Sequence, residues 1–517
     1  MNAAFRILLF LAASSSAAAL SFIFIKTQPA PVVITEMDFD EPVGATLFGD
    51  VDGDGNKDAV LLLGRRVEVH RYQSDGTFSR KTNITVKLPG DAVAVDLCIL
   101  DSPGSTGAIR KSKLLVACAR GIFQRSLEKD DAAFTQINIP YLTDSLVPRA
   151  AGADPIAMTL QGDFNNDGIP ELMIPLGEGV AILKNTENGW KKIGIAKANV
   201  EVDLALGENR PGASLKIHFE LPRIATVDVV HSNNKKERLL SISRDADAWV
   251  YRVTDDSLIL IEHVRGLYRF DSEDNLRDFR GTRRNEETND RPVGLVAVDL
   301  NADAIPDFIA SRFRDGQVFI ILGKEGEFTA DVPNRVIDVD GWAVLAQARD
   351  VTGDGRPELI VPRLPKLGIA GALKALLSRK VTFELWVYKN IAAPGIVSDS
   401  PDWKRSFDLE ILIGGDEGKI SVNARLLAGT YNLDGGDGME FIALTAPDKL
   451  GVFGNDTNSV FTSDPVWEFT IPSVEDWSEA DMRGTDMNGD GRDDLTIVYG
   501  SNKRGSKNKL LFIVSKK

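Results

Sequence analysis

The sequence predicts an all-β protein assembled from repeated four-stranded sheets. A short acidic phrase recurs five times along the 517 residues, and an apolar, β-branched run follows each copy. The 45 Gly and 23 Pro are spread along the chain, which is typical of many short strands joined by tight turns. A composition of 43% hydrophobic and 26% charged residues is that of an ordinary globular protein, so burial of several sheet cores is expected.

The charge balance excludes nucleic acid as a partner of the whole chain. With 60 Lys and Arg against 75 Asp and Glu, the formal net charge is 60 − 75 = −15. Nucleic acids are held by neutralising their phosphates, which requires a basic face. The same excess of acid opposes attraction of the chain as a whole to anionic membranes.

The first 31 residues predict export. Met1–Arg6 is short and basic, residues 7–25 carry no charge, and Lys26 with a Pro-containing spacer follows. Small residues at 17–19 would suit cleavage of a signal peptide, whereas the full 19-residue run approaches the ~20 residues that cross a bilayer and would make an uncleaved anchor. Both alternatives stay open. Either one places residues 32–517 in the periplasm, on the cell surface or in the medium, with residues 7–25 as a possible membrane tether.

The recurring phrase has acidic or polar side chains at positions 1, 3, 5 and 9, and Gly at position 6 in all copies but one. Apolar runs follow directly at residues 59–63, 172–174, 308–310, 359–361 and 495–498. The residues at positions 1, 3, 5 and 9 of the five copies are Asp50, Asp52, Asp54 and Asp58; Asp163, Asn165, Asp167 and Glu171; Asp299, Asn301, Asp303 and Asp307; Asp350, Thr352, Asp354 and Glu358; and Asp486, Asn488, Asp490 and Asp494.

This spacing predicts oxygen coordination of Ca²⁺. Alternate side chains of a tight loop converge on one side, and Gly at position 6 allows the positive φ that turns the backbone around the ion. Calcium accepts six to eight oxygen ligands in loose geometry, which suits a mixture of Asp, Asn, Thr and Glu better than magnesium does. Zinc and iron are disfavoured because no His or Cys joins the five loops.

Two other interpretations of the phrase are an EF-hand and a metal-free turn. An EF-hand requires Glu at position 12 and a helix after the loop, but position 12 of the Gly-containing copies is Leu61, Ile174, Val361 or Ile497, and the following residues are strand-like. A metal-free Asx turn would leave several carboxylates to repel one another. In the third copy Ala304 replaces Gly, so that loop must accept strain or bind weakly.

These phrases resemble the FG-GAP/VCBS repeats found in integrin alpha-subunit propellers and in many exported bacterial proteins. The resemblance rests on the calcium loop, the strand after it, and small residues before it at Gly49–Asp50, Gly162–Asp163 and Gly429–Thr430. The Gly-Ala-Pro of the family is absent after every copy. The resemblance covers about residues 33–517 and implies a β-propeller with calcium in its strand-linking loops.

The unit count predicts eight four-stranded propeller blades, with seven as the alternative. Residues 432–438 of the seventh unit contain an insertion that spoils its metal register, while Val32–Phe39 is expected to supply the outer strand of the last blade and close the ring. The units are anchored at Asp50, Asp96, Asp163, Asp228, Asp299, Asp350, Thr430 and Asp486.

Two insertions and two cysteines complete the sequence. Apolar residues recur at helical spacing over 364–380 among basic residues, which predicts an amphipathic helix that packs on the propeller or contacts a partner or membrane. Residues 271–291 mix both charges and are expected to form a solvated loop. Cys98 and Cys118 are either two buried thiols or one disulfide, since spacing in sequence gives no Cα distance.

No catalytic motif stands out. The chain has no nucleophile elbow, zinc-protease helix or Walker loop, and its four His are scattered. The sequence therefore predicts an exported, calcium-stabilised β-propeller that binds or scaffolds a protein or glycan, as an adhesion module does. The alternative is an extracellular propeller enzyme, a polysaccharide lyase or hydrolase.

Overall fold

In the computed structural model, the described residues run from 32 to 516 with gaps. The longer gaps are 100–110, 140–153, 207–214, 266–293, 414–419, 422–427, 473–479 and 500–507, and each remaining gap is four residues or fewer. The predicted signal or anchor segment 1–31 and the predicted loop 271–291 lie outside the described residues. Within the described residues, no helix is both long and apolar enough to cross a membrane.

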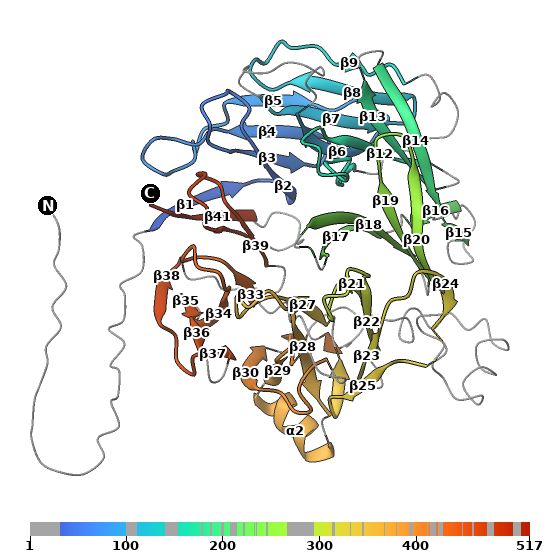
Figure 1. The fold of residues 1–517 in the computed structure, drawn as a ribbon. Coiled ribbons are helices and arrows are strands. Elements are labelled where there is room, and N and C mark those ends of the chain that lie inside the picture. Colours follow the sequence, from blue (N-terminus) through green and yellow to red (C-terminus); the bar gives the residue numbers. More distant parts are fainter. Residues whose placement is uncertain are drawn as a thin grey trace, which may run out of the picture.

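Among the described residues, eight sheets of four or five mainly antiparallel strands are arranged in a ring, which confirms eight blades over seven (Figure 1). Blade 1 contains β2 (Val43–Gly49), β3 (Asp58–Leu63), β4 (Arg66–His70) and β5 (Ile84–Lys87). Blade 2 contains β6 (Ala92–Cys98), β7 (Lys113–Cys118), β8 (Gly121–Ser126) and β9 (Thr135–Gln136), with β10 (Ile156–Ala157) parallel to β6. Blade 3 contains β11 (Gln161–Gly162), β12 (Glu171–Leu176), β13 (Gly179–Thr186) and β14 (Gly189–Lys197). Blade 4 contains β17 (Arg223–Val230), β18 (Lys236–Arg244), β19 (Asp247–Val253) and β20 (Leu258–Arg265), with β24 (Gly326–Thr329) parallel to β20.

The second half of the ring continues in the same order. Blade 5 contains β21 (Gly294–Val298), β22 (Asp307–Arg312), β23 (Gln317–Ile321) and β25 (Arg335–Asp338). Blade 6 contains β26 (Gly341–Ala343) and β27 (Gln347–Arg349), both paired with β28 (Glu358–Pro365), then β29 (Lys380–Tyr388) and β30 (Trp403–Glu410). Blade 7 contains β33 (Ala428–Tyr431), β34 (Glu440–Ala446), β35 (Lys449–Phe453) and β38 (Trp467–Thr470), and blade 8 contains β39 (Asp481–Thr485), β40 (Asp494–Tyr499), β41 (Asn508–Ser515) and β1 (Val32–Phe39). Three two-stranded ribbons are β15 (Glu201–Leu206) with β16 (Leu215–Glu220), β31 (Leu412–Ile413) with β32 (Ile420–Ser421), and β36 (Asn455–Asp456) with β37 (Val460–Phe461).

The ring closes by joining the two ends of the propeller chain. Strand β1 pairs antiparallel with β41 from Val32 opposite Ser515 to Phe39 opposite Asn508. The predicted closing strand is therefore confirmed with its boundaries. Pairing of this kind leaves no open edge where the first and last strands meet.

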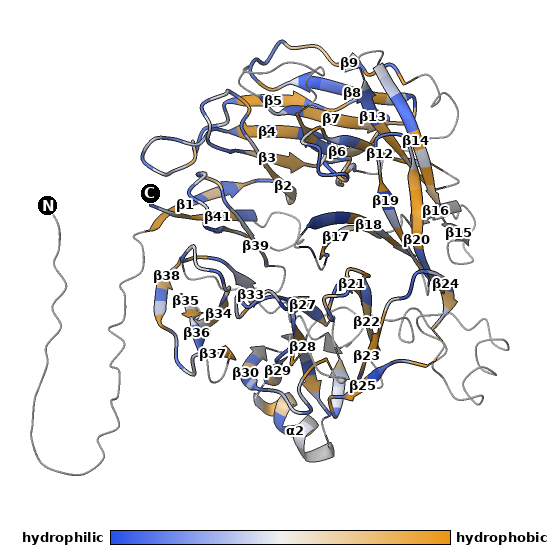
Figure 2. Ribbon diagram, in the orientation of Figure 1, coloured by the Kyte–Doolittle hydropathy of each residue, from blue (hydrophilic) through white to orange (hydrophobic). Residues whose placement is uncertain are grey.

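Apolar side chains fill the space between neighbouring blades. Val60 of blade 1 packs in one buried cluster with Val116 of blade 2, while Leu61, on the other face of the same strand, packs with Phe512 of blade 8. This alternation explains why the strands after the acidic phrases are continuously apolar, since both of their faces are covered. Figure 2 shows the hydrophobic residues concentrated along strands such as β3, β4 and β7.

The two cysteines are free, buried thiols. Within the β6–β7 pair, Cys98 lies opposite Lys113 and Cys118 lies opposite Ala92, so the two sulfurs sit at opposite ends of the strands. The structure therefore supports the alternative of two buried thiols and excludes the disulfide. Burial raises the pKa of both thiols, that of Cys118 to about 12.

The helix α2 (Ile369–Ser378) lies between β28 and β29 of blade 6 (Figure 1). It is shorter than the predicted range 364–380, because β28 continues to Pro365 and β29 begins at Lys380. Ala375 packs with Val381 and against Leu364, whereas Leu373 and Leu377 are 56% and 77% exposed. The helix therefore packs on its own propeller through Ala375, and contact of its exposed leucines with a partner or membrane stays a prediction.

Candidate metal loops

The five acidic phrases form equivalent loops in blades 1, 3, 5, 6 and 8. Each loop connects the first strand of its blade to the second strand: β2 to β3, β11 to β12, β21 to β22, β27 to β28, and β39 to β40. Position 9 is in every case the first residue of the second strand: Asp58, Glu171, Asp307, Glu358 and Asp494. The loops thus share one place in the blade as well as one sequence pattern.

The carboxylate at position 1 organises each loop. Its second oxygen accepts a hydrogen bond from the backbone N–H of position 6: Gly55 at 3.0 Å, Gly168 at 2.9 Å, Ala304 at 3.1 Å, Gly355 at 2.8 Å and Gly491 at 3.0 Å. The first oxygen accepts from position 4 or 5, for example from Gly53 at 2.6 Å. The backbone is therefore wrapped around the side chain at position 1, which brings positions 3 and 5 to the same side of the loop.

Position 6 has a positive φ in all five loops, as the pattern predicts. The angle is 88° at Gly55 and 68° at Ala304. Ala304 resolves the question raised by the third copy, because its loop keeps the shared conformation and accepts the strain of an Ala in the left-handed region.

The carboxylates at position 9 are buried under the loops. Each accepts a hydrogen bond from the N–H of position 2: Val51 at 3.1 Å, Phe164 at 2.9 Å, Leu300 at 2.8 Å, Val351 at 3.0 Å and Met487 at 2.8 Å. Burial outweighs these bonds and raises the pKa of Asp58 to about 6 and those of Glu171, Asp307 and Glu358 to about 7. It also raises the pKa of Asp494. Negative charge at position 9 is thus costly unless a cation compensates it.

The first loop gathers its ligands most closely. Carboxylate oxygens of Asp50, Asp52 and Asp58 lie within 4.8 Å of one another, and Asp54 is not part of this group. Within the described residues, the acidic side chains of the other four loops form no equally tight group. In the blade 3 loop, Oε1 of Glu171 is buried and has no hydrogen-bond partner. These oxygens fit a hard cation, which accepts several oxygen ligands in flexible geometry.

Two loops carry additional partners. In blade 3, the ammonium of Lys184 lies 2.6 Å from Asp167 and also contacts Asp255. Burial raises the pKa of Asp167, but the ion pair with Lys184 outweighs it and lowers the pKa overall. In blade 8, the hydroxyl of Ser515 donates to Asp490 at 2.7 Å. The negative charge of the blade 3 loop is therefore partly compensated by the protein itself.

A related loop lies in blade 7, between β33 and β34. It shares the hydrogen bonds to positions 1 and 9 but not the left-handed residue at position 6. Leu433 N–H donates to Glu440 at 2.8 Å, and Gly435 N–H donates to Asn432 at 2.8 Å. Asn432 is therefore position 1 and Glu440 is position 9, so the predicted anchor at Thr430 and the predicted insertion were wrong. Gly436 at position 5 and Asp437 at position 6 still depart from the metal pattern. Glu440 directly precedes an apolar run, and counting back eight residues from it reaches Asn432. That count would have located this loop from the sequence.

Glu262 of blade 4 is a second residue that sequence reasoning missed. It is fully buried, and its Oε2 has no hydrogen-bond partner. Two successive amides hold it beside the blade 5 loop: Gly323 N–H donates to Asp307 at 2.9 Å and Lys324 N–H donates to Glu262 at 3.0 Å. Burial raises the pKa of Glu262 to about 8. No sequence signal marks it, because the two carboxylates belong to different blades.

Comparison with known proteins identifies no family. No known family profile matches the chain, and no curated protein matches it in sequence. An Agrocybe aegerita lectin that recognises non-reducing terminal N-acetylglucosamine is 13% identical, with a TM-score of 0.39 and coverage of 87% of this chain and 92% of that chain. The WD40 domain of Toxoplasma gondii coronin is 8% identical, with a TM-score of 0.32 and coverage of 95% and 90%. Similarities this low say nothing about what this chain binds.

Proposed function

We propose that this chain is an exported propeller of the FG-GAP/VCBS type, in which Ca²⁺ fills the acidic loops and stabilises a scaffold that binds a protein or glycan. The observation that carries the proposal is the repeated loop itself. Five loops at equivalent places in five blades wrap the backbone around one carboxylate and bury a second one. A bare turn needs the first of these features but not the second.

Electrostatics supports a divalent cation in these loops. Three carboxylates with oxygens within 4.8 Å of one another, as at Asp50, Asp52 and Asp58, repel one another unless they are protonated or neutralised. Bound Ca²⁺ would supply that neutralisation, with oxygens of positions 1, 3, 5 and 9 as ligands. The unpartnered Oε1 of Glu171 is the buried atom that such an ion would satisfy.

A metal in these loops would act on structure. Each loop joins the first strand of a blade to the buried second strand, so an ion would fix the geometry between them. The enzyme alternative would need a catalytic group in a pocket. The pocket on blade 4, formed by His231, Glu237, Arg252 and two neighbours, offers it little support. There, His231 and Arg252 are both engaged by Glu237, which leaves the carboxylate occupied rather than available as a base.

Thermal unfolding with and without EDTA tests the calcium proposal. Saturation of one site at 100 times its Kd stabilises a protein by about 2.7 kcal/mol, so loss of several ions is expected to lower the Tm by about 5 °C or more. Restoring Ca²⁺ should restore the Tm, whereas Mg²⁺ at the same concentration should not. Asp52→Ala in the first loop should reduce the calcium effect, and Asp75→Ala at an exposed site outside the loops is the matched control. An unchanged Tm in EDTA would contradict the proposal.

A further inference from the structure

Blade 4 carries a polar pocket outside the acidic loops, here named the blade 4 pocket. It has a volume of about 470 Å³ and is lined by His231, Asn233, Lys235, Glu237 and Arg252. His231, Asn233 and Lys235 belong to the turn between β17 and β18, Glu237 lies on β18, and Arg252 lies on β19. The volume is within the range of about 300–1,000 Å³ that is usual for small-molecule sites.

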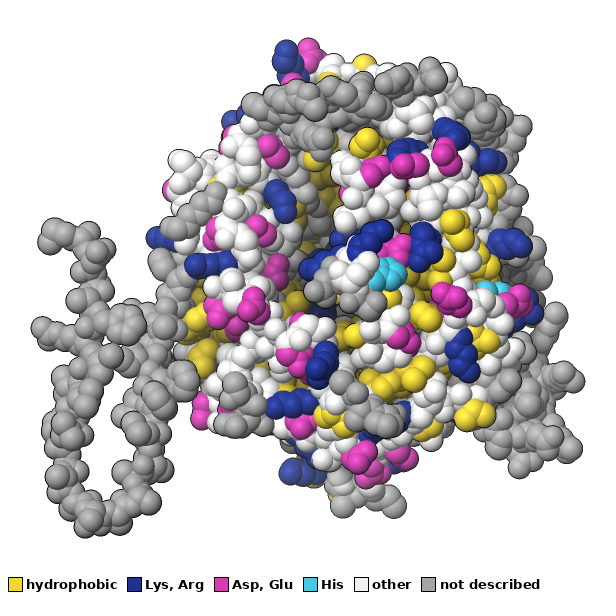
Figure 3. Space-filling model, in the orientation of Figure 1, with side chains coloured by type: hydrophobic (Ala, Val, Ile, Leu, Met, Phe, Trp, Pro, Cys, Tyr) yellow, Lys and Arg dark blue, Asp and Glu magenta, His cyan; other side chains and the backbone are white. Residues whose placement is uncertain are grey.

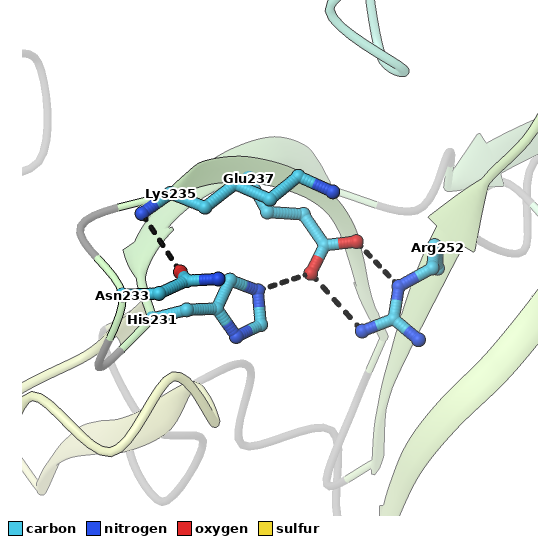
Figure 4. A pocket seen from close by; sticks show the side chains of 5 residues that line it. All are labelled: His231, Asn233, Lys235, Glu237 and Arg252. Carbon is cyan, nitrogen blue, oxygen red and sulfur yellow. Dashed lines mark hydrogen bonds and ion pairs between the residues drawn. The ribbon is translucent and has the colours of Figure 1, made fainter.

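The one carboxylate that lines the pocket is already engaged by two neighbours. Glu237 receives hydrogen bonds from His231 at 2.7 Å and from two nitrogens of Arg252, one of them at 3.0 Å. Although burial raises the pKa of Glu237, the bonds from Arg252 and His231 lower it overall. Figure 4 shows both side chains turned toward the Glu237 carboxylate, with the Lys235 side chain extending past it. The carboxylate therefore fixes the orientation of Arg252 and His231.

The pocket lining carries a net positive charge. Lys235 adds a second permanent cation, and its ammonium forms no ion pair among the described residues. Its backbone N–H donates a hydrogen bond to Oδ1 of Asn233 at 3.0 Å. Lys235 and Arg252 against Glu237 give the lining a net charge of +1 before any contribution from His231. Glu325 also acts on Arg252 electrostatically but is exposed, where solvent and salt weaken its effect. Figure 3 shows Lys, Arg and His side chains gathered around a carboxylate over β17 and β18.

We propose that the blade 4 pocket binds an oxyanion group of a ligand, a carboxylate, sulfate or phosphate, through Arg252 and Lys235. A guanidinium held in place by a carboxylate is well suited to a planar or tetrahedral oxyanion, because its free N–H groups keep a fixed direction. The inference does not depend on calcium, since no residue of the pocket belongs to an acidic loop.

Ligand-observed saturation-transfer NMR on the full chain in calcium-containing buffer tests this inference. Glucuronate, glucose 6-sulfate and glucose 6-phosphate present the three oxyanions on one sugar, and glucose is the neutral control. At least one anionic sugar should bind, with affinity that falls as NaCl is raised from 50 to 500 mM, and glucose should not. The strongest of the three identifies the preferred group.

A matched pair of variants locates the binding. Lys235→Gln should weaken binding of the anionic sugar about tenfold, as loss of one charge-assisted hydrogen bond does. Lys236→Gln removes the same charge from the next residue, which is exposed and does not line the pocket, and should leave binding unchanged. Both residues are exposed, so both variants should fold. The inference is overturned if no anionic sugar binds, if glucose binds equally well, or if Lys236→Gln weakens binding as much as Lys235→Gln.

Discussion

At the scale of single residues, backbone conformation and burial define the acidic loops. Position 6 must adopt a positive φ so that its N–H reaches the carboxylate at position 1, and four of the five loops place Gly there. Ala304 shows that the loop geometry is strong enough to impose this conformation on a residue that disfavours it. The strain at Ala304 is therefore a cost that the rest of the loop offsets.

Ala304→Gly is expected to stabilise the protein by about 0.5 kcal/mol, because relief of left-handed strain is partly offset by the larger entropy of Gly in the unfolded chain. The reverse change, Gly55→Ala at φ 88°, should cost about 1 kcal/mol through backbone strain alone, since the added Cβ would meet no atom within 4 Å.

Urea unfolding of the full chain measures both changes, with Gly90→Ala as the control. At Gly90 an added Cβ also meets no atom within 4 Å, and φ is not positive. Equal effects of alanine at positions 55 and 90 would show that φ is not the cause.

At the scale of elements, β1 joins the two ends of the ring. Its eight residues pair with β41 along their whole length, and Met37 is buried in the cluster that contains Phe512. By comparison, Ala375 is the one buried residue among the described side chains of α2, and it packs in a small cluster with Val381. The strand is therefore part of the ring, whereas the helix is an addition to blade 6.

Deletion of residues 1–39 is expected to destabilise the propeller by more than about 3 kcal/mol, through loss of buried apolar surface and of a complete strand pairing. The exposed edge of β41 should also promote self-association. Urea unfolding and size-exclusion chromatography measure the two effects, and a chain that lacks residues 1–31 but keeps β1 is the control. If the two deletions unfolded at the same urea concentration, β1 would not be the closing strand in solution.

At the scale of the whole molecule, buried acids link stability to pH and to calcium. The pKa values of Asp58, Glu171, Asp307 and Glu358 are raised to about 6 or 7, and that of Glu262 to about 8. Without metal, these groups bind more protons in the folded than in the unfolded state between about pH 4.5 and 8. Their contribution to the free energy of unfolding therefore falls as pH rises through that window. Calcium requires the ionised form, so its stabilising effect should grow over the same window.

The difference between the Tm in Ca²⁺ and the Tm in EDTA is therefore expected to widen from pH 5.5 to pH 8.5. Differential scanning calorimetry at four pH values measures it. Glu262→Gln removes the carboxyl group whose pKa is raised to about 8. In EDTA, the Tm of this variant should therefore change less with pH near pH 8. A difference that is constant or narrows with pH would contradict coupling of calcium to these carboxylates.

The repeat determined much of the architecture. The nine-residue phrase marked five blade starts, the strands after them and the left-handed turns, because ligand spacing, glycine and apolar runs are all local signals. It also gave the closing strand, since the last unit was one strand short. It misplaced the loop of blade 7, where Gly436 and Asp437 at positions 5 and 6 depart from the usual pattern and Thr430 was taken as the anchor.

The remaining features were decided by tertiary structure. The contact of Glu262 with the blade 5 loop, the pairing of Lys184 with Asp167 and the convergence of His231, Glu237 and Arg252 each join residues whose spacing in sequence carries no signal. The first contact arises when blades 4 and 5 become neighbours, and the other two arise when the strands of one blade pair. A local pattern can specify a loop because its partners lie within nine residues, whereas burial, charge compensation and the shape of a pocket depend on which strands and blades become neighbours.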